Sequence, residues 1–419
     1  MEKVWNKIVH IYSSTNLVIK IIIGIIIGTL LAFYATNLIW IGTFGDLFVG
    51  ALKAIAPILV FILVISSLSQ NTVKKDGRFS TVIGLYLVST FCAALTAVLI
   101  SFLFPINLSL GIENITNQSV PAGLGEVVHN LLINIVVNPI SSLTEGNYLG
   151  ILFWAIISGI VLKDIASENT KNVLSDISDG VSAVVKIIID FAPFGIMGLV
   201  YNAVSSNGIN IFTTYGKLVI LLAGCMLFVF FVINPLIVYS VIKQNPYPLV
   251  IKCLKESGIT AFFTRSSAAN IPINMALCEK LGLDRDMYSV SIPLGATINM
   301  NGAAVTISVM TLAAVHTLGI SISLPGALIL CILSTFAACG ASGVAGGSLL
   351  LIPMACSLFG ISNDIAIQVV GVGFIIGVIQ DSLETALNSS ADVVFSATAE
   401  FYKWKQEGKE IPKIQVIGD

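Results

Sequence analysis

The stretch QDSLETALNSSAD, residues 380–392, places three carboxylates directly after the apolar run GVGFIIGVI at 371–379. Its polar side chains share one face of a helix, because at about 100° per residue they fall within an arc of about 100°. They are Asp381, Glu384, Thr385, Asn388 and Asp392. A charge at the centre of a bilayer costs at least about 2.5–3.5 kcal/mol, so this stripe is expected to face protein or water. A structural salt-bridge network is one interpretation, and bound cations or a substrate ammonium is the other. The scarcity of nearby basic residues favours the second.

The composition of the whole chain agrees with a membrane setting for this stretch. Hydrophobic residues make up 56% of the 419 and charged residues 11%, whereas a soluble domain carries about 25% charged residues. Repeated apolar runs of about 18 residues or more predict an all-α polytopic membrane protein, because a helix needs about 20 to cross the hydrocarbon. The alternating segments of a β-barrel are absent.

Other compositional signals exclude several classes of function. The net charge of −2 and the lack of a basic tract give no indication of a nucleic-acid partner. The seven cysteines are scattered singly and the three histidines are isolated, so neither a disulfide framework nor a resident metal site is predicted. The first apolar run follows Lys20 without a small-residue cleavage site, which predicts a retained helix.

Apolar segments of sufficient length predict eight spanning helices. They lie near 17–36, 46–69, 80–104, 124–162 (long and interrupted), 179–204, 214–242, 286–316 and 363–402. Two further apolar segments, 249–278 and 324–358, are interrupted by TRSSAANIP (264–272) and ACGASGVAGGS (338–348). Each interruption leaves arms of about 12 to 15 residues, which are too short to cross a bilayer.

The distribution of lysine and arginine then orients the segments. Basic residues occur in alternate loops, whereas 105–123, 205–216 and 317–323 contain none. Because cationic loops stay in the cytoplasm, both termini are predicted to be cytoplasmic. Lys280 and Arg285 stay on that side only if the segment 249–278 enters the membrane and returns, and the segment 324–358 then enters from the outer face.

Two re-entrant hairpins of opposite orientation form an inverted repeat, which is typical of secondary transporters that bind substrate near the midplane. Ordinary helix kinks are the alternative explanation for each break. Two breaks at matched places in oppositely oriented halves favour a binding site.

Two further stretches carry candidate site residues. Arg265 is the only basic residue in the two breaks, and it is expected either to bind a substrate anion or to pair with a carboxylate of the last helix. Between the breaks lies SIPLGATINMNGAAVTI (291–307), which contains Asn299 and Asn301. Gly295 permits an unwound turn there, whose carbonyls would suit Na⁺. A helix with polar residues packed against the bundle is the alternative.

The chain resembles a known family at these motifs: TRSSAANIP, PLGATINMNGA, the glycine-rich second break and D-x-x-E-T-x-x-N-x-x-x-D. It is similar over nearly its whole length to the dicarboxylate/amino acid:cation symporters, the relatives of glutamate transporters, and most similar to the bacterial sodium–serine/threonine symporters. The resemblance implies an elevator-type fold and a homotrimer. Its scaffold part would be 1–78 and 124–204, its transport part 79–104 and 205–403, and its cytoplasmic tail 404–419.

The resemblance also implies roles for individual residues in substrate binding. Asp381 would hold the substrate ammonium, and Asn388 would contact the substrate carboxylate. Ser266 and Ser267 of the first hairpin would hold the same carboxylate. The predicted substrate site also includes Arg265, Glu384 and Thr385.

Sodium sites follow from the same resemblance. One would use the carbonyls of Gly295, Asn299 and Asn388 together with the Asp392 carboxylate. A second would use carbonyls around Thr297 and at the tip of the second hairpin, namely Ala338, Cys339 and Ala341. Members that transport acidic substrates carry an aspartate where this chain has Asn301, beside positions Tyr86, Ser89 and Thr90. The missing charge predicts a lower sodium stoichiometry.

Glu384 is the second departure from the acidic-substrate members, which have an arginine at this position. A carboxylate here would face the side-chain carboxylate of glutamate or aspartate, and like charges at about 4 Å repel. The change therefore favours a small neutral amino acid, preferably one with a hydroxyl. We expect Glu384 to pair with Arg265.

Together these observations predict a sodium-driven symporter that imports L-serine and L-threonine across the bacterial cytoplasmic membrane. Membrane lipid would surround it. A proton-coupled or dicarboxylate carrier of the same fold is the alternative. The chain has no Walker motif for ATP, no nucleophile–base pair for an enzyme, and no pore-lining ring for a channel beyond the hairpin tips.

Overall fold

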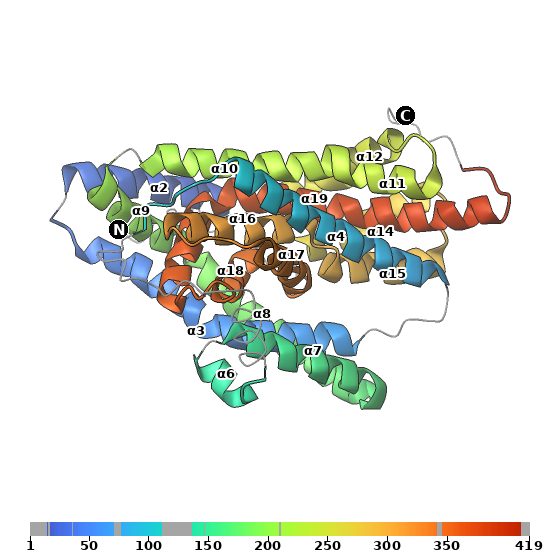
Figure 1. Ribbon diagram of the computed structural model, residues 1–419, viewed down its shortest axis with the longest axis horizontal. Coiled ribbons are helices and arrows are strands. Elements are labelled where there is room, and N and C mark those ends of the chain that lie inside the picture. Colours follow the sequence, from blue (N-terminus) through green and yellow to red (C-terminus); the bar gives the residue numbers. More distant parts are fainter. Residues whose placement is uncertain are drawn as a thin grey trace, which may run out of the picture.

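The computed structural model describes residues 15, 17–35, 37–70, 77–110, 136–145, 147–208, 211–341 and 346–411. This part of the chain is helical and contains no β-strand (Figure 1). Five helical runs within it are long and apolar enough to cross a membrane, and a bent pair of helices makes a sixth. The predicted class, an all-α polytopic membrane protein, is therefore confirmed. The first 12 residues of the predicted fourth span, 124–135, lie outside the described residues.

The N-terminal helices pack closely through glycines. Helices α2 (Leu17–Tyr34) and α3 (Trp40–Ser69) both lie against α9 (Ala192–Asn207). A side chain at Gly28 would collide with the backbone of Met197, and one at Gly198 would collide with the backbone of Gly45. Small residues of this kind let membrane helices approach each other and pack by van der Waals contact. Figure 1 shows α6 (Pro139–Glu145), α7 (Tyr148–Ile165) and α8 (Glu168–Asp190) beside α3 along the lower edge.

The predicted single helix over 179–204 is wrong. The chain forms α8 and α9 instead, and the two are bent by 53° at Phe191. Pro193 lies in the first turn of α9. A proline there cannot continue the hydrogen bonding of a preceding helix, so the chain turns before it.

One helix, α16 (Asn301–Thr317), lies at the centre of the bundle and is surrounded by other helices. Helix α16 contacts α4 (Gly77–Leu103), α17 (Leu324–Ala338) and α19 (Asn363–Gln406). A further long run, α10 (Ile211–Phe228), η1 (Val229–Ile233) and α11 (Asn234–Ile242), packs on α19 and α4. All side chains of α16 from 301 to 315 are buried. Figure 1 shows α16 between these neighbours in the middle of the bundle.

The first broken segment forms a helical hairpin. Its first arm is α12 (Tyr247–Cys253), η2 (Leu254–Gly258) and α13 (Ile259–Thr264), and its second arm is α14 (Ser267–Lys280). The amide of Asn270 donates to the Ser257 carbonyl at 3.3 Å, and Lys280 pairs with Glu256 at 2.9 Å. These bonds join the two arms on either side of the tip. The break is shorter than predicted, because only Arg265 and Ser266 leave the helix and Pro272 lies inside α14.

The second broken segment folds in the same way. It consists of α17, a turn, η3 (Gly347–Leu351) and α18 (Ile352–Ser357), with residues 342–345 of the predicted break outside the described part. A Cβ added to Gly326, at the start of α17, would lie 3.6 Å from Phe359. The two ends of the segment therefore return to the same place.

The hairpins lie on α19 on opposite sides of Asp381. The first contacts α19 beyond that residue, where Asn270 and Asn274 bond Ser389. The second contacts the earlier part, where a Cβ on Gly373 would lie 2.7 Å from a methyl group of Leu349. This arrangement agrees with hairpins that run in opposite directions toward one point.

Candidate functional site

The two hairpin tips meet at Asp381, which is 4% exposed. Arg265 of the first tip places its Nε 3.1 Å from Asp381 Oδ2. The backbone N–H of Gly346, in the second tip, donates to Asp381 Oδ1 at 3.2 Å. One carboxylate thus joins helix α19 to both hairpins, so any cation that binds here competes with the Arg265 guanidinium.

Arg265 has a backbone conformation that is uncommon for its residue type. Its φ is +51°, in the left-handed region, and its N–H caps α13 by donating to the Ala261 carbonyl at 2.8 Å. Such a conformation costs about 1–3 kcal/mol and persists where surrounding structure over-determines it. The turn aims the guanidinium at α19, and Ser266 begins the next helix by accepting from the Ala269 N–H at 3.2 Å.

The expected pairing of Glu384 with Arg265 is wrong. Arg265 pairs with Asp381, the second of the two possibilities that the sequence leaves open for this arginine. Glu384 Oε2 instead accepts from Thr306 Oγ1 of α16 at 2.7 Å and from Ser348 Oγ of the second hairpin at 2.8 Å. Gln380, one turn earlier on α19, also donates to it. The two carboxylates share a helix face but turn toward different neighbours.

Asn388 and Thr385 continue the same face. The Asn388 Oδ1 accepts from the Gly302 N–H at 2.7 Å, and its Nδ2 lies 3.4 Å from Met300 Sδ. Thr385 donates to the carbonyl of Asp381 in its own helix at 2.8 Å. Asn388 therefore covers the start of α16, where the chain is broken.

The break between α15 (Arg285–Ile298) and α16 lies at Asn299 and Met300, with φ, ψ of −93°, 75° and −114°, 55°. The predicted unwound turn at Gly295 is thus wrong, because Gly295 is helical. Its lack of a side chain has another cause: a Cβ would lie 2.7 Å from Asp392 Oδ1 and 2.8 Å from the Tyr86 hydroxyl. Gly295 allows α15 to approach the last carboxylate.

The first predicted sodium set is brought together around Asp392, which is completely buried. Asn299 Nδ2 donates to Asp392 Oδ1 at 2.9 Å and lies 3.4 Å from the Asn388 carbonyl. Within the described part of the chain, Asp392 Oδ2 has no hydrogen-bond partner. A buried carboxylate oxygen without a donor is costly unless a cation completes it, so the residues fit a bound Na⁺.

The second predicted set also lies together. Cys339 Sγ is 3.6 Å from the Ile298 carbonyl, next to Thr297. Ala338 and Ala341 form the turn after α17, where the Ala341 N–H donates to the Ala338 carbonyl at 2.9 Å. This tip of the second hairpin thus lies against the end of α15.

Asn301 is a neutral residue at the position where the members with acidic substrates carry an aspartate. Its Oδ1 accepts from Ser89 Oγ at 3.0 Å and from Thr90 Oγ1 at 2.9 Å, both on α4. Tyr86 contributes its carbonyl to the same two hydroxyls. The four residues are neighbours as predicted, and their hydroxyl groups are bonded to protein acceptors.

Three residues around Glu384 were not predicted from the sequence: Thr306, Ser348 and Gln380. Gln380 lies in the quoted stretch four residues before Glu384, so helical spacing places the two side chains side by side. Thr306 and Ser348 come from other elements, and no local spacing relates them to Glu384. Of the two predicted hairpin serines, Ser267 is buried and Ser266 half-buried at the first tip.

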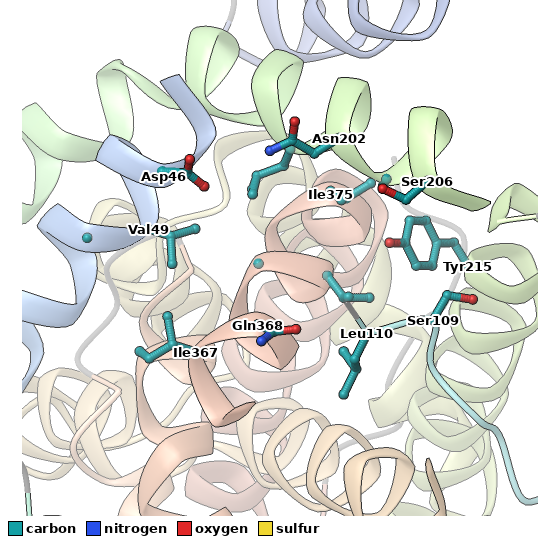
Figure 2. A pocket seen from close by; sticks show the side chains of 15 residues that line it. Asp46, Val49, Ser109, Leu110, Asn202, Ser206, Tyr215, Ile367, Gln368 and Ile375 are labelled. Atoms are coloured by element: carbon teal, nitrogen blue, oxygen red, sulfur yellow. The ribbon is translucent and has the colours of Figure 1, made fainter. Parts of the chain in front are cut away.

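A separate cavity of about 540 Å³ lies away from these residues. Figure 2 shows it between α3 and α9 on one side and α10 and α19 on the other, with Asp46 as the one charged residue of its lining. It includes none of the predicted site residues. The two groups of helices are therefore not closely packed along this boundary.

The chain is similar to known proteins over most of its length. Residues 15–400 match the sodium:dicarboxylate symporter family. The serine/threonine transporter SstT of Bifidobacterium adolescentis is 60% identical over 412 residues, which cover 98% of this chain and 96% of that protein. Proteins of the same name from Streptococcus agalactiae and Streptococcus thermophilus are 57% and 54% identical, over 95% and 96% of this chain and 97% and 99% of their own lengths. The chain belongs to the sodium:dicarboxylate symporter family.

Proposed function

We propose that the protein is a sodium-coupled symporter that imports serine and threonine across the bacterial cytoplasmic membrane. The observation that carries the proposal is the buried pair Asp381 and Glu384, two carboxylates of which Asp381 pairs with Arg265 and Glu384 bonds neutral donors. Such a site binds an ammonium and rejects a second acidic group. The relatives named as serine/threonine transporters, 54–60% identical, support the same substrates.

In this proposal the substrate lies between the two tips. Its ammonium replaces Arg265 at Asp381, and its carboxylate meets Ser266, Ser267 and the free N–H groups at the start of α14. The N-terminus of a helix suits an anion because its first N–H groups are unpaired and its dipole is positive there. The side chain then points toward Glu384, while Thr385 and Asn388 form the floor.

Sodium is the second substrate. Asp392 Oδ2, which lacks a described partner, and the carbonyls of Gly295, Asn299 and Asn388 would hold one ion. The carbonyls near Thr297, with Ala338, Cys339 and Ala341 in the second tip, would hold another. A neutral Asn301 beside Ser89 and Thr90 supports two ions in place of three. Sodium at the second tip would order that hairpin over the amino acid, which couples the two fluxes.

The moving parts are also proposed. Residues 1–78 and 124–204 would form the scaffold of a homotrimer, and 79–104 and 205–403 would slide past it as an elevator, with 404–419 and the N-terminus in the cytoplasm. Eight spanning helices and two re-entrant hairpins would complete this fold. The cavity lined by α3 and α9 against α10 and α19 supports a boundary at this place. The glycine packing of α2 and α3 on α9 supports a rigid scaffold.

A competition panel tests the proposal. Purified protein in liposomes takes up labelled serine while other amino acids compete, with and without Na⁺. We expect serine and threonine to compete strongly, aspartate and glutamate to fail, and all uptake to need Na⁺. Strong competition by aspartate would favour the dicarboxylate alternative, and uptake driven by a pH gradient without Na⁺ would favour proton coupling. We expect the labelled serine to be recovered chemically unchanged, as for a transporter and not an enzyme.

A further inference from the structure

Three neutral donors converge on a single oxygen of Glu384. Thr306 Oγ1 at 2.7 Å comes from α16, Ser348 Oγ at 2.8 Å from the second hairpin, and the amide of Gln380 from α19. All three side chains are at most 1% exposed. We call Thr306, Ser348 and Gln380 the Oε2 clamp.

The other carboxylate oxygen of Glu384 has no donor within the described part of the chain, since all three bonds reach Oε2. A carboxylate oxygen accepts about two hydrogen bonds. Oε2 is therefore saturated, and as far as the described residues go, Oε1 keeps its capacity to accept. By holding Oε2, the clamp also fixes the orientation of Oε1.

Gln380 shows how strongly the fold favours this arrangement. Its amide nitrogen donates to Thr306 at 2.7 Å as well as to Glu384, while its own Oε1 is buried with no partner among the described residues. Leaving a buried acceptor unpaired is unfavourable. The amide is thus used to hold Thr306 and Glu384 in place, at the expense of its own oxygen.

We propose that Glu384 Oε1 accepts the hydroxyl of the substrate and that the Oε2 clamp sets the preference for β-hydroxy amino acids. The inference rests on the proposed function and names the atom that discriminates. Asp381 and Glu384 are three residues apart on α19, so their side chains are neighbours. The ammonium and the hydroxyl of serine are separated by two carbon atoms, which lets one molecule reach both carboxylates.

Alanine then becomes the discriminating competitor. It fills the same place but leaves Oε1 without a donor once water is excluded, and sites built around a hydrogen bond reject analogues that lack it. Thr306, Ser348 and Gln380 act through Glu384 and need not touch the substrate. They are positioning residues, and Ser348 adds a link between closure of the second hairpin and recognition of the side chain.

The test is the ratio of alanine to serine inhibition constants in liposomes containing the wild type, Thr306→Val, Ser348→Ala or Gln380→Met. We expect each variant to lower the wild-type ratio about tenfold, the effect of losing one well-oriented hydrogen bond to a charge, mainly through weaker serine binding. Thr306→Ser keeps the hydroxyl and should retain the wild-type ratio. Thr398→Val is the matched control, because Thr398 is buried on α19 and among the described residues its hydroxyl bonds the Val394 carbonyl of its own helix, at 2.7 Å.

The outcomes separate the two proposals. Absence of Na⁺-dependent serine uptake by the wild type would overturn the proposed function itself. Normal uptake with an unchanged ratio in Thr306→Val and Ser348→Ala, which lie on different elements, would overturn the role of the clamp alone. A variant that fails to fold is identified by its elution as aggregate, and the other two positions then carry the test.

Discussion

The two hairpins look alike in outline but are attached to α19 in different ways. The first is held by a buried amide–hydroxyl cluster: Asn270 Nδ2 bonds Ser389 Oγ at 2.7 Å and Ser257 Oγ at 3.0 Å, and Asn274 Nδ2 bonds the Ser389 carbonyl at 3.0 Å. The second is held by the site itself. Where the structure describes it, its polar bonds to α19 end on Asp381 and Glu384.

This difference teaches which hairpin responds to substrate. The cluster around Asn270 lies beyond the site and contains no group that the proposed substrate would use. The bonds of the second hairpin end on carboxylates that a substrate would use. Binding must therefore rearrange the second hairpin, whereas in the first it displaces Arg265 from Asp381 and can leave the cluster around Asn270 in place. This fits the proposed closure of 324–358 over the amino acid. The contrast between the hairpins can be tested by single substitutions.

Asp381→Asn removes the one carboxylate that both tips contact. We expect serine binding to become undetectable, because the ammonium loses its counter-charge and Arg265 is left unpaired, at a cost of about 3–5 kcal/mol for a broken buried pair. Calorimetric titration with serine measures it. Asp286→Asn, an exposed change at the start of α15, is the control, and wild-type affinity in Asp381→Asn would contradict the assignment.

Asn270→Leu breaks the first hairpin's cluster while keeping the size of the side chain. The hydroxyls of Ser257 and Ser389 each lose the Asn270 donor, although Asn274 still donates to Ser389 at 3.1 Å. We therefore expect a loss of about 2–3 kcal/mol in stability. Thermal unfolding in detergent measures it, and the folded fraction should bind serine within about threefold of wild type. Ser390→Ala, whose hydroxyl bonds carbonyls of its own helix, should change stability far less. Loss of serine selectivity with unchanged thermal stability would show that the first hairpin, and not the second, responds to substrate.

Cys339 reports on the second hairpin directly, since it is half-buried at the tip. We expect Na⁺ with serine to slow its alkylation severalfold by shifting the population toward the closed hairpin. Mass spectrometry after a timed reaction measures it in a Cys92→Ser background, which removes the other half-buried thiol. Buried Cys278 in the first hairpin is the internal control. Equal protection of both, or of neither, would remove the contrast between the hairpins.

Glu256→Gln should give the smallest effect. Glu256 bridges Lys252 and Lys280 at 2.9 Å each across the base of the first hairpin, and it is 29% exposed. An exposed ion pair contributes about 0–1 kcal/mol, so we expect thermal stability within about 0.5 kcal/mol of wild type and unchanged uptake. A large loss would show that the base, and not the cluster at Asn270, fixes this hairpin.

Much of the fold and of the site composition could be predicted from local patterns. The stripe in 380–392 lies on one buried face of α19, and both apolar breaks form hairpins. The partner of each carboxylate could not be predicted. Asp381 and Glu384 share a face by spacing, but the direction of each carboxylate depends on Arg265 and Thr306, which lie 116 and 78 residues away in the chain.

The misplaced break at Gly295 and the unpredicted bend at Phe191 have a related cause. Gly295 has a weak helix propensity, so the sequence suggests an unwound turn there. The glycine instead allows a close approach to Asp392, and the chain breaks at Asn299 and Met300 where Asn388 covers it. The bend at Phe191 could not be predicted from hydropathy, because the apolar segment 179–204 continues on both sides of it. Tertiary contacts decide such positions over local propensity.

The most direct test of the account is serine uptake into proteoliposomes with and without an inward Na⁺ gradient, in the wild type and in Asp392→Asn. Serine should accumulate only with the gradient, and Asp392→Asn should abolish this accumulation, because the buried carboxylate is the proposed sodium ligand. Accumulation that survives removal of the gradient, or that Asp392→Asn leaves unchanged, would contradict it.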